Sequence, residues 1–280
     1  MGTEQRPASQ TAIGVALLRA IHETCDSLPK LHRDPVAPLL VGDEMMRRAK
    51  AAPERMQGAL AVSIRSHVAL RSRYAEDQLC DAASQGVRQY VILGAGYDTF
   101  AYRQPTWAAS LRIFEVDHVA SQQEKIERLR SAGIAVPPNV TFVPADFENA
   151  TLHETLTNGG VDIELPTFFA CLGVMVYLRK EAVDAIFREV ASFPKGSRIV
   201  FTFSQGESSP GLSALAKKAA AAGEPFRTYY DPDILRRDLL ETGYSRVAIL
   251  APEEAAELYY SGTGVGLPPP RRAAIACACV

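Results

Sequence analysis

A glycine-containing turn gives the chain its most readable chemistry. Gly94-Ala95-Gly96 comes directly after a short apolar run that ends at Leu93. Glycine at such a turn lets the backbone bend sharply and approach a ligand with no side chain between them. By itself the pattern is weak evidence, because many turns between a strand and a helix contain glycine for packing reasons alone. It becomes informative together with the acids that follow it.

Two of these acids, Glu115 and Asp117, end the next apolar run. A carboxylate at that strand end can accept both hydrogen bonds of an adenosine ribose diol. Alternation along a strand would place both side chains on one side, and only one of them need hold the ribose. In the competing interpretation, the acids merely solvate the strand end or cap the helix expected from Ser121.

Asp98 discriminates between adenosine cofactors. A dinucleotide brings a pyrophosphate, which favours a third glycine and a helix N-terminus without negative charge. Here the third glycine is absent, and Asp98 stands at the expected start of the following helix. A carboxylate there would repel a pyrophosphate, but it could bind the ammonium group of a methionine moiety or cap the helix. We therefore expect S-adenosylmethionine as the cofactor rather than NAD or FAD.

Asp146 and Phe147 follow a third apolar run and could contact adenine. The carboxylate can accept a hydrogen bond from the exocyclic amine, and the ring offers a stacking or edge contact. A loop acid followed by a core aromatic would produce the same pattern, so this assignment needs further support.

These residues can act together only if the chain brings them to one edge of a sheet. Short apolar runs rich in β-branched residues predict strands over 90–93, 112–116, 140–144, 167–171, 198–203, 246–250 and 274–279. Helical spacing of apolar residues predicts helices over 11–24, 42–51, 54–85 with an interruption near 71–74, 121–132, 180–191, 213–222 and 231–242. No clear helix separates the last two strands, which could form an antiparallel end of the sheet.

Strands that alternate with helices predict a doubly wound α/β fold with a mostly parallel seven-stranded sheet. Continuous apolar strands fit a sheet covered on both faces. Ligands of such sheets bind outside the carboxyl ends of the strands. We expect residues 1–85 to form a helical cap packed on a Rossmann-like domain of residues 86–280, the two making one structural unit.

Composition argues against several other classes of protein. With 280 residues, 47% hydrophobic and 22% charged, the chain can bury a full core. Its formal net charge of −2 gives no reason to expect nucleic acid or an anionic membrane as a partner. Five scattered cysteines predict neither a zinc site nor a disulfide framework. Without an apolar run of membrane-spanning length or a secretion signal, we expect a cytoplasmic protein. The oligomeric state stays open.

Several motifs together resemble the leucine carboxyl methyltransferase family, and especially its bacterial branch of uncharacterised and polyketide-tailoring enzymes. They extend over nearly the whole chain, and comprise residues 11–20, Asp34-Pro35, residues 94–99, Tyr102-Arg103, residues 115–117, Asp146-Phe147, Gly173-Val174, Tyr177-Leu178 and residues 223–226. The resemblance implies a Rossmann-like, class I methyltransferase fold with an N-terminal helical lid over S-adenosylmethionine.

The resemblance also implies roles for single residues. Asp117 would hold the ribose, Asp146-Phe147 the adenine region, and Arg71 the carboxylate of the cofactor. A guanidinium suits that last task because it can meet a carboxylate with two parallel hydrogen bonds. Arg73 is the alternative ligand, with Arg71 then a solvated helix residue.

Two positions depart from the family pattern. Phe100 stands where the family usually has arginine after the loop, so a polar role there is lost. Leu172 stands where many relatives carry glutamate, which leaves only backbone contacts to the cofactor at that position.

We expect an enzyme that methylates a carboxylate or hydroxyl oxygen of a small metabolite. Tyr177 is a candidate for the acceptor pocket, although packing would explain it equally well. A carboxylate acceptor needs no general base, whereas a phenol would profit from one. His118 is better explained as a solvated residue at a strand end, so no catalytic base is named. The alternatives are a homologue that binds the cofactor without methyl transfer, and a nicotinamide-dependent oxidoreductase.

Overall fold

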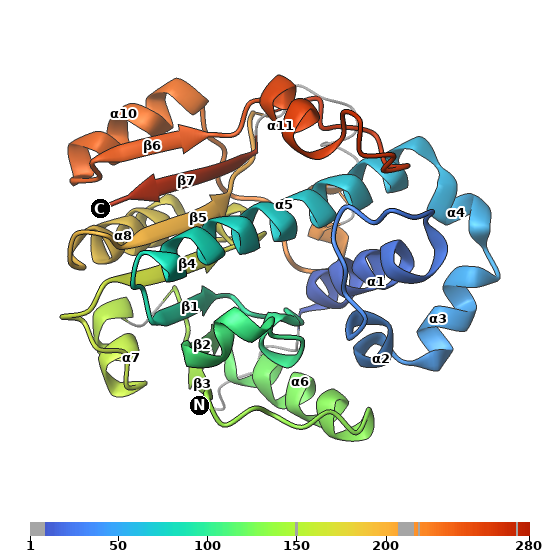
Figure 1. Cartoon of the computed structure of the whole chain (residues 1–280), viewed down its shortest axis with the longest axis horizontal. Coiled ribbons are helices and arrows are strands. Elements are labelled where there is room, and N and C mark those ends of the chain that lie inside the picture. The colour runs from blue at the N-terminus through green and yellow to red at the C-terminus, as the bar shows by residue number, and fades with distance from the viewer. Residues whose placement is uncertain (1–8, 149–150, 207–215, 218, 273) are drawn as a thin grey trace.

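One seven-stranded sheet organises the chain, with its strands in the order β3-β2-β1-β4-β5-β7-β6 (Figure 1). The computed structural model describes residues 9–148, 151–206, 216–217, 219–272 and 274–280. The strands are β1 (Gln89–Leu93), β2 (Arg112–Asp117), β3 (Val140–Pro144), β4 (Thr167–Cys171), β5 (Arg198–Thr202), β6 (Arg246–Ile249) and β7 (Ile275–Cys279). Every predicted strand is confirmed; the central strands β1, β4 and β5 are buried throughout, whereas β3 and β6 at the two edges are partly exposed.

The first five strands are parallel, and β7 runs antiparallel between β5 and β6. The predicted antiparallel end is therefore confirmed. The expectation that no helix separates the last two strands is wrong, because α11 (Pro252–Tyr259) lies between them. This helix buries only Ala255, so it lacks the apolar stripe that reveals a helix in a sequence.

The sheet has its topological switch point between β1 and β4. From β1 the chain proceeds through β2 to β3 on one side, and β4 and β5 lie on the other side. Crossovers to the two sides leave a crevice at the carboxyl ends of the strands beside this point. The loop after β1 and the acid that ends β2 both belong to that edge.

The helices differ from the prediction mainly in where they break. The structure has α1 (Gln10–Cys25), α2 (Ala37–Val41), α3 (Asp43–Lys50), α4 (Pro53–Gln57), α5 (Ala59–Ser84), α6 (Val119–Ser131), α7 (Leu152–Asn158), α8 (Lys180–Ala191) and α10 (Pro232–Thr242). The interruption expected near 71–74 is wrong; the break lies at Gly58, where ψ is 143°. Helix α5 continues past Arg71 because Leu70 and Tyr74 are both buried. The helix expected over 213–222 falls partly outside the described residues.

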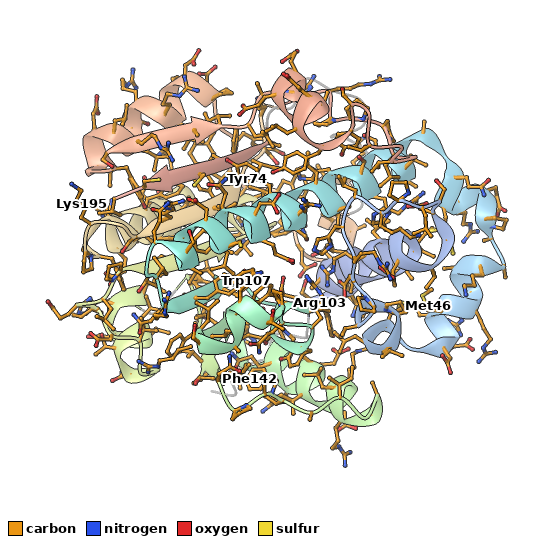
Figure 2. All side chains as sticks on the ribbon, in the orientation of Figure 1. Met46, Tyr74, Arg103, Trp107, Phe142 and Lys195 are labelled. Atoms are coloured by element: carbon orange, nitrogen blue, oxygen red, sulfur yellow. The ribbon has the colours of Figure 1, made fainter. Side chains whose placement is uncertain are left out.

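The segment between β1 and β2 forms two 3₁₀ turns, η1 (Phe100–Tyr102) and η2 (Thr106–Ser110), rather than an α-helix. Helix α5 covers this face of the sheet instead (Figure 1). Its residues Leu70, Tyr74 and Leu79 share a buried cluster with Tyr90 of β1 and Phe168 of β4. Figure 2 shows Tyr74 on this helix among the side chains of the whole chain. On the other face, residues of α7, α8 and α10 belong to a second buried cluster, which also contains residues of β1, β2 and β4.

The first helices gather beyond the carboxyl end of β1 (Figure 1). A third buried cluster joins α1, α2 and α3 to Tyr97, in the loop after β1, and to Leu129 of α6. The N-terminal helices therefore pack on the edge of the sheet where the predicted site residues lie. Among the described residues, no helix has both the length and the apolar character needed to cross a membrane.

Candidate functional site

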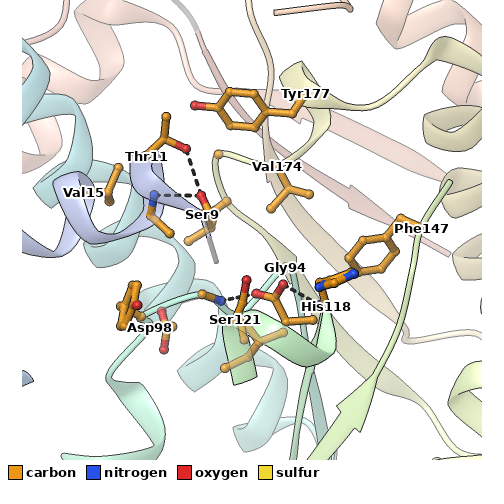
Figure 3. A pocket seen from close by; sticks show the side chains of 18 of the residues that line it. Ser9, Thr11, Val15, Gly94, Asp98, His118, Ser121, Phe147, Val174 and Tyr177 are labelled. Atoms are coloured by element: carbon orange, nitrogen blue, oxygen red, sulfur yellow. Dashed lines mark hydrogen bonds between the residues drawn. The ribbon is translucent and has the colours of Figure 1, made fainter. Parts of the chain in front are cut away.

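A pocket opens at the carboxyl ends of the parallel strands, beside the switch point (Figure 3). The sequence-predicted residues that line it are Arg71, Gly94, Ala95, Gly96, Asp98, Asp117, Asp146, Phe147, Leu172 and Tyr177. Glu115 does not line it. The structure thus brings together residues from α5, from the loops after β1, β3 and β4, and from the end of β2.

The glycine loop takes a shape that other residues would resist. Gly94 and Gly96 have φ angles of 69° and 45°, both in the left-handed region that favours glycine. The amides of Gly94 and Ala95 donate to the carbonyl of Val116 at 2.8 and 3.2 Å, which ties the loop to β2. A Cβ on Gly96 would stand 3.3 Å from Cβ of Ala12 in α1. The backbone of the loop is therefore fixed where it lines the pocket, and Gly96 faces α1 across a short distance.

Asp117 ends β2 with its carboxylate directed at the loop. One oxygen accepts a hydrogen bond from the amide of Gly96, and the other accepts from the amide of His118 at 2.6 Å (Figure 3). Burial raises the pKa of the Asp117 carboxyl, and these two amides oppose the rise. Each carboxylate oxygen has a second lone pair, so the group can still accept from two hydroxyls.

Glu115 lies on the same side of β2 as Asp117 but outside the pocket. Its carboxylate accepts from Nζ of Lys125 at 2.6 Å and from the hydroxyl of Tyr102 at 3.1 Å. The side chains of Glu115 and Lys125 are each 1% exposed. Of the two acids between which the sequence left the ribose contact open, only Asp117 lines the pocket.

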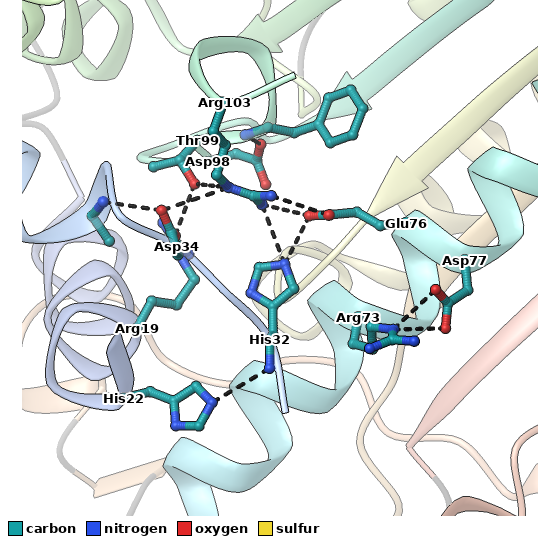
Figure 4. Close-up of polar contacts among 12 residues, drawn as sticks. Arg19, His22, His32, Asp34, Arg73, Glu76, Asp77, Asp98, Thr99 and Arg103 are labelled. Carbon is teal, nitrogen blue, oxygen red and sulfur yellow. Dashed lines mark hydrogen bonds and ion pairs between the residues drawn. The ribbon is translucent and has the colours of Figure 1, made fainter. Parts of the chain in front are cut away.

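Arg71 enters the pocket from α5, whereas Arg73 turns away from it. Arg73 is exposed and binds Asp77 at 2.9 Å (Figure 4). Among the described residues, the guanidinium of Arg71 has neither a hydrogen bond nor an ion pair, and it lies against Gly173. Burial, and then the like charge of Arg19, lowers the pKa of Arg71 to about 10. A partly buried cation without a hydrogen-bonded or ion-paired partner is a candidate site for an anionic group, although the charge of Asp98 acts on it at longer range.

Asp98 caps the turn that follows the loop. Its Oδ1 accepts a hydrogen bond from the amide of Phe100 at 2.9 Å, so the helix expected there is the short 3₁₀ turn η1. Phe100 itself is 1% exposed and packs edge-on against Tyr90, with ring centroids 5.3 Å apart. Phe100, which stands in place of the family's usual arginine, therefore packs in the apolar core and does not line the pocket.

Phe147 and His118 lie together at the other end of the pocket (Figure 3). Asp146, which precedes Phe147 in the chain, also lines the pocket. Oδ1 of Asp146 accepts from the amide of Glu148 at 3.0 Å, which fixes the loop after β3. His118 is the N-cap of α6, where its Nδ1 accepts from the amide of Ala120 at 3.3 Å. It is partly buried at the pocket wall rather than simply solvated.

One wall of the pocket comes from the N-terminal lid that the resemblance implies, but none of its residues was predicted from the sequence as part of the site. It consists of residues on one face of α1 and the start of that helix: Ser9, Thr11, Ala12, Val15 and Arg19. The amide of Thr11 donates to Oε2 of Glu224 at 2.9 Å, which closes this wall onto a distant segment. The spacing of these residues marks one helix face, but only the close approach of Ala12 to Gly96 shows what that face covers. The resemblance over residues 11–20 was the available signal.

The donor set fits S-adenosylmethionine. The unpaired guanidinium of Arg71 suits the amino-acid carboxylate, and Asp117 suits the ribose diol. The lining carboxylates Asp98, Asp117, Asp146, Glu148 and Glu224 make the pocket suited to a sulfonium and an ammonium group, and unsuited to a pyrophosphate. No group of three or more potential metal ligands occurs within the described parts of the chain.

Comparisons with known proteins agree with this chemistry. The sequence profile of the leucine carboxyl methyltransferase family matches residues 12–191. A Bacillus subtilis (strain 168) protein, provisionally named S-adenosyl-L-methionine-dependent methyltransferase YktD, is 31% identical over 91% of this chain and 92% of its own length. A Mycolicibacterium smegmatis protein with the same provisional description is 34% identical over 80% of this chain and 72% of its own length.

Solved structures share the fold at low sequence identity. A DUF574-family protein from Streptomyces avermitilis superposes with a TM-score of 0.59 at 17% identity, covering 97% of both chains. A Thermobifida fusca protein, provisionally titled a methyltransferase, gives a TM-score of 0.61 at 16% identity, covering 98% of this chain and 95% of its own. These likenesses confirm the predicted Rossmann-like α/β fold.

Proposed function

The chain belongs to the leucine carboxyl methyltransferase family of S-adenosylmethionine-dependent methyltransferases, and we propose that it methylates a carboxylate or hydroxyl oxygen of a small molecule. The observation that carries this proposal is the placement of Arg71 and Asp117 at the two sides of one glycine loop. Arg71 receives the amino-acid carboxylate and Asp117 receives the ribose of S-adenosylmethionine. Because the loop between them carries glycines at 94 and 96, its backbone can approach the ligand closely.

S-adenosylmethionine, when bound, supplies a methyl group on a sulfonium and therefore needs no further activation. The chain's own contribution is alignment and exclusion of water. Asp98 and the loop hold the amino-acid end, Asp117 and Asp146 hold the nucleoside end, and α1 covers the pocket through Ala12 and Val15. Holding both ends fixes the direction in which the methyl group faces the acceptor.

The acceptor side is formed by aromatic and apolar groups. Tyr177 packs edge-on against Phe226, with ring centroids 5.5 Å apart, and Val15 and Leu178 line the pocket nearby. Burial raises the pKa of Tyr177, so this phenol stays neutral at physiological pH. The imidazole of His118 is engaged as a helix cap. These features favour an acceptor that is already ionised, and a carboxylate fits best.

Two measurements test the proposal. Isothermal titration calorimetry should show binding of S-adenosylmethionine and none of NAD; absence of binding at millimolar S-adenosylmethionine would contradict the assigned site. A methyl-transfer assay with radiolabelled cofactor against small carboxylic acids and phenols should then yield base-labile methyl esters. Labelled ethers would indicate a hydroxyl acceptor. Cofactor binding without turnover on any acceptor would support a homologue that has lost methyl transfer.

A further inference from the structure

A cluster of charged and polar side chains lies directly behind the glycine loop, and the proposed reaction does not use it (Figure 4). Its members are Arg19 of α1, Asp34 before α2, Glu76 of α5, and Thr99 and Arg103 beyond the loop. Four of these, Arg19, Asp34, Thr99 and Arg103, belong to the motifs that carry the family resemblance, yet of the four only Arg19 lines the pocket.

Arg19 connects α1 to the backbone of the loop. Its Nε donates to Oδ2 of Asp34 at 2.9 Å, and its Nη2 donates to the carbonyl of Tyr97. The side chains of Arg19 and Asp34 are 8% and 1% exposed. The contact with Tyr97 is made to a main-chain atom, so it constrains the path of the loop and not the placement of a side chain.

Asp34 holds Arg19 in that orientation. Besides Arg19, its carboxylate accepts from the hydroxyl of Thr99 at 2.8 Å and from the amide of Ala37 at 3.0 Å. Burial alone would raise the pKa of Asp34, but the guanidiniums of Arg19 and Arg103 outweigh it and hold the pKa below its usual value. Asp34 therefore stays ionised and joins both sides of the loop.

Arg103 fixes the far side of the loop to α5. Its Nε donates to Thr99 Oγ1 at 3.0 Å and its Nη1 donates to Glu76 Oε2 at 3.0 Å. His32 reaches the same carboxylate at 2.9 Å. The segment from Tyr97 to Thr99 is thus held from α1 on one side and from α5 on the other.

The two arginines that line the pocket, Arg19 and Arg71, differ in their hydrogen bonds. Arg71 contacts no acceptor within the described residues, whereas Arg19 already donates to a carboxylate and to a carbonyl. The carbonyl of Tyr97 belongs to the same rigid peptide plane as the amide of Asp98. Fixing that carbonyl therefore fixes the direction in which Asp98 leaves the loop and enters the pocket.

We propose that Arg19 is a positioning residue for the methyl-donor site: oriented by Asp34, it sets the peptide between Tyr97 and Asp98 and does not itself bind the donor. The inference rests on the proposed function, because the donor is S-adenosylmethionine. It assigns a task to the arginine of α1 and to Asp34. It also makes the packing of α1 a condition for a well-formed donor site.

A comparison of two ligands separates positioning from direct binding. We would measure dissociation constants for S-adenosylmethionine and for its decarboxylated analogue. Arg19→Met should weaken both ligands equally, by about 10- to 100-fold, the range for loss of hydrogen bonds to a charged group. Arg71→Met should weaken S-adenosylmethionine selectively, because only that ligand carries the carboxylate. Arg48→Met, which removes an exposed arginine paired with Glu44 on α3, is the matched control and should change neither.

Two further variants keep the test decisive if Arg19→Met folds poorly. Asp34→Asn should weaken both ligands by a similar factor, and the double variant Arg19→Lys/Asp34→Asn should be less impaired than the sum of its parts, because the pair acts as one unit. Hydrogen exchange of the Tyr97–Thr99 amides should quicken in Arg19→Lys without ligand.

The outcomes are distinguishable. If the wild-type chain binds neither ligand, the proposed function fails. If the wild-type chain binds the ligands, and Arg19→Met and Asp34→Asn bind them as tightly as the wild type does, the positioning role is overturned. It is also overturned if Arg19→Met, like Arg71→Met, weakens S-adenosylmethionine and leaves the decarboxylated analogue unaffected.

Discussion

The guanidinium of Arg71 lies so close to the backbone of Gly173 that a Cβ added at residue 173 would stand 2.5 Å from Nη1. Gly173 has a φ of 77°, and its amide donates to Thr202 Oγ1 at 2.6 Å, so the backbone at this point is fixed. The turn after β4 therefore supports Arg71 as it enters the pocket, and this support depends on the absence of a side chain.

Gly173→Ala should lower the affinity for S-adenosylmethionine, because the new methyl group displaces the guanidinium. It should also cost about 1 kcal/mol of stability through the left-handed backbone. Calorimetry and urea denaturation measure the two effects. Gly133→Ala is the control: Gly133 has a φ of 68° with nothing near a new Cβ, so stability should fall and affinity should not. Equal affinity in both variants would show that Arg71 tolerates the displacement.

Asp117→Ala should weaken binding of S-adenosylmethionine by about 1–3 kcal/mol, the cost of leaving buried hydroxyl partners unpaired. The loss should be similar for adenosine, because the contact is made to the ribose. The amide of Gly96 also loses its acceptor, so the loop should exchange its amide hydrogens faster. Asp184→Ala, on the exposed surface of α8, serves as control. Wild-type affinity in Asp117→Ala would remove the ribose assignment.

Lys125→Met should destabilise the fold by about 3–5 kcal/mol, because it leaves the buried carboxylate of Glu115 without its cation. Among the described residues Glu115 Oε1 has no hydrogen-bond partner, so after the substitution only the hydroxyl of Tyr102, on the other oxygen, would still donate to this carboxylate. The double variant Lys125→Met/Glu115→Leu should recover most of the loss. Urea denaturation measures both, and Lys180→Met, at the exposed pair with Asp184, should cost less than about 1 kcal/mol.

Glu115 also provides a test of the ribose contact. Because its carboxylate lies outside the pocket, Glu115→Gln should change stability and leave the affinity for S-adenosylmethionine unchanged. An affinity loss as large as that of Asp117→Ala would transfer the ribose contact to Glu115.

The carboxylate of Glu76, paired with His32 and Arg103, should make the free energy of unfolding fall in acid. Burial would raise the pKa of Glu76, but His32 and Arg103 outweigh it and lower the pKa from 4.5 to about 2. A carboxyl whose folded pKa is depressed contributes stability above its unfolded pKa and loses it as pH falls through the folded value. The contribution of Glu76 is therefore complete above pH 4.5 and is lost towards pH 2. Glu76→Gln should be less stable at pH 7 and show a flatter dependence of the unfolding free energy on pH in this range. An unchanged slope, measured against Glu44→Gln, would contradict the assignment.

Local features of the sequence were sufficient for the sheet and for the centre of the site. Each strand is a short apolar run, buried throughout in β1, β4 and β5, so its position depends on its own residues. The glycine loop is also local, because only glycine adopts the backbone angles of Gly94 and Gly96 easily. The position of Asp117 beside the loop can be deduced from these two features, because Asp117 ends β2, the strand that pairs with β1.

The choice between equivalent residues was not local. Glu115 and Asp117 project from one side of one strand, and Arg71 and Arg73 belong to one turn of α5. What separates them is burial and pairing: Lys125 of α6 binds Glu115 behind the pocket, and Asp77, one turn further along α5, binds the exposed Arg73. Which face of β2 and of α5 is covered by the rest of the chain decides these roles.

The sequence by itself determined the strands, the loop and the class of cofactor, because strand burial and glycine backbone angles are properties of short segments. The tertiary structure decided between the two acids and between the two arginines that the residues themselves left open, and it decided which residues of α1 form the pocket wall. Those assignments depend on how helices separated by many residues pack against one strand edge, and a single sequence does not encode that packing in any local pattern.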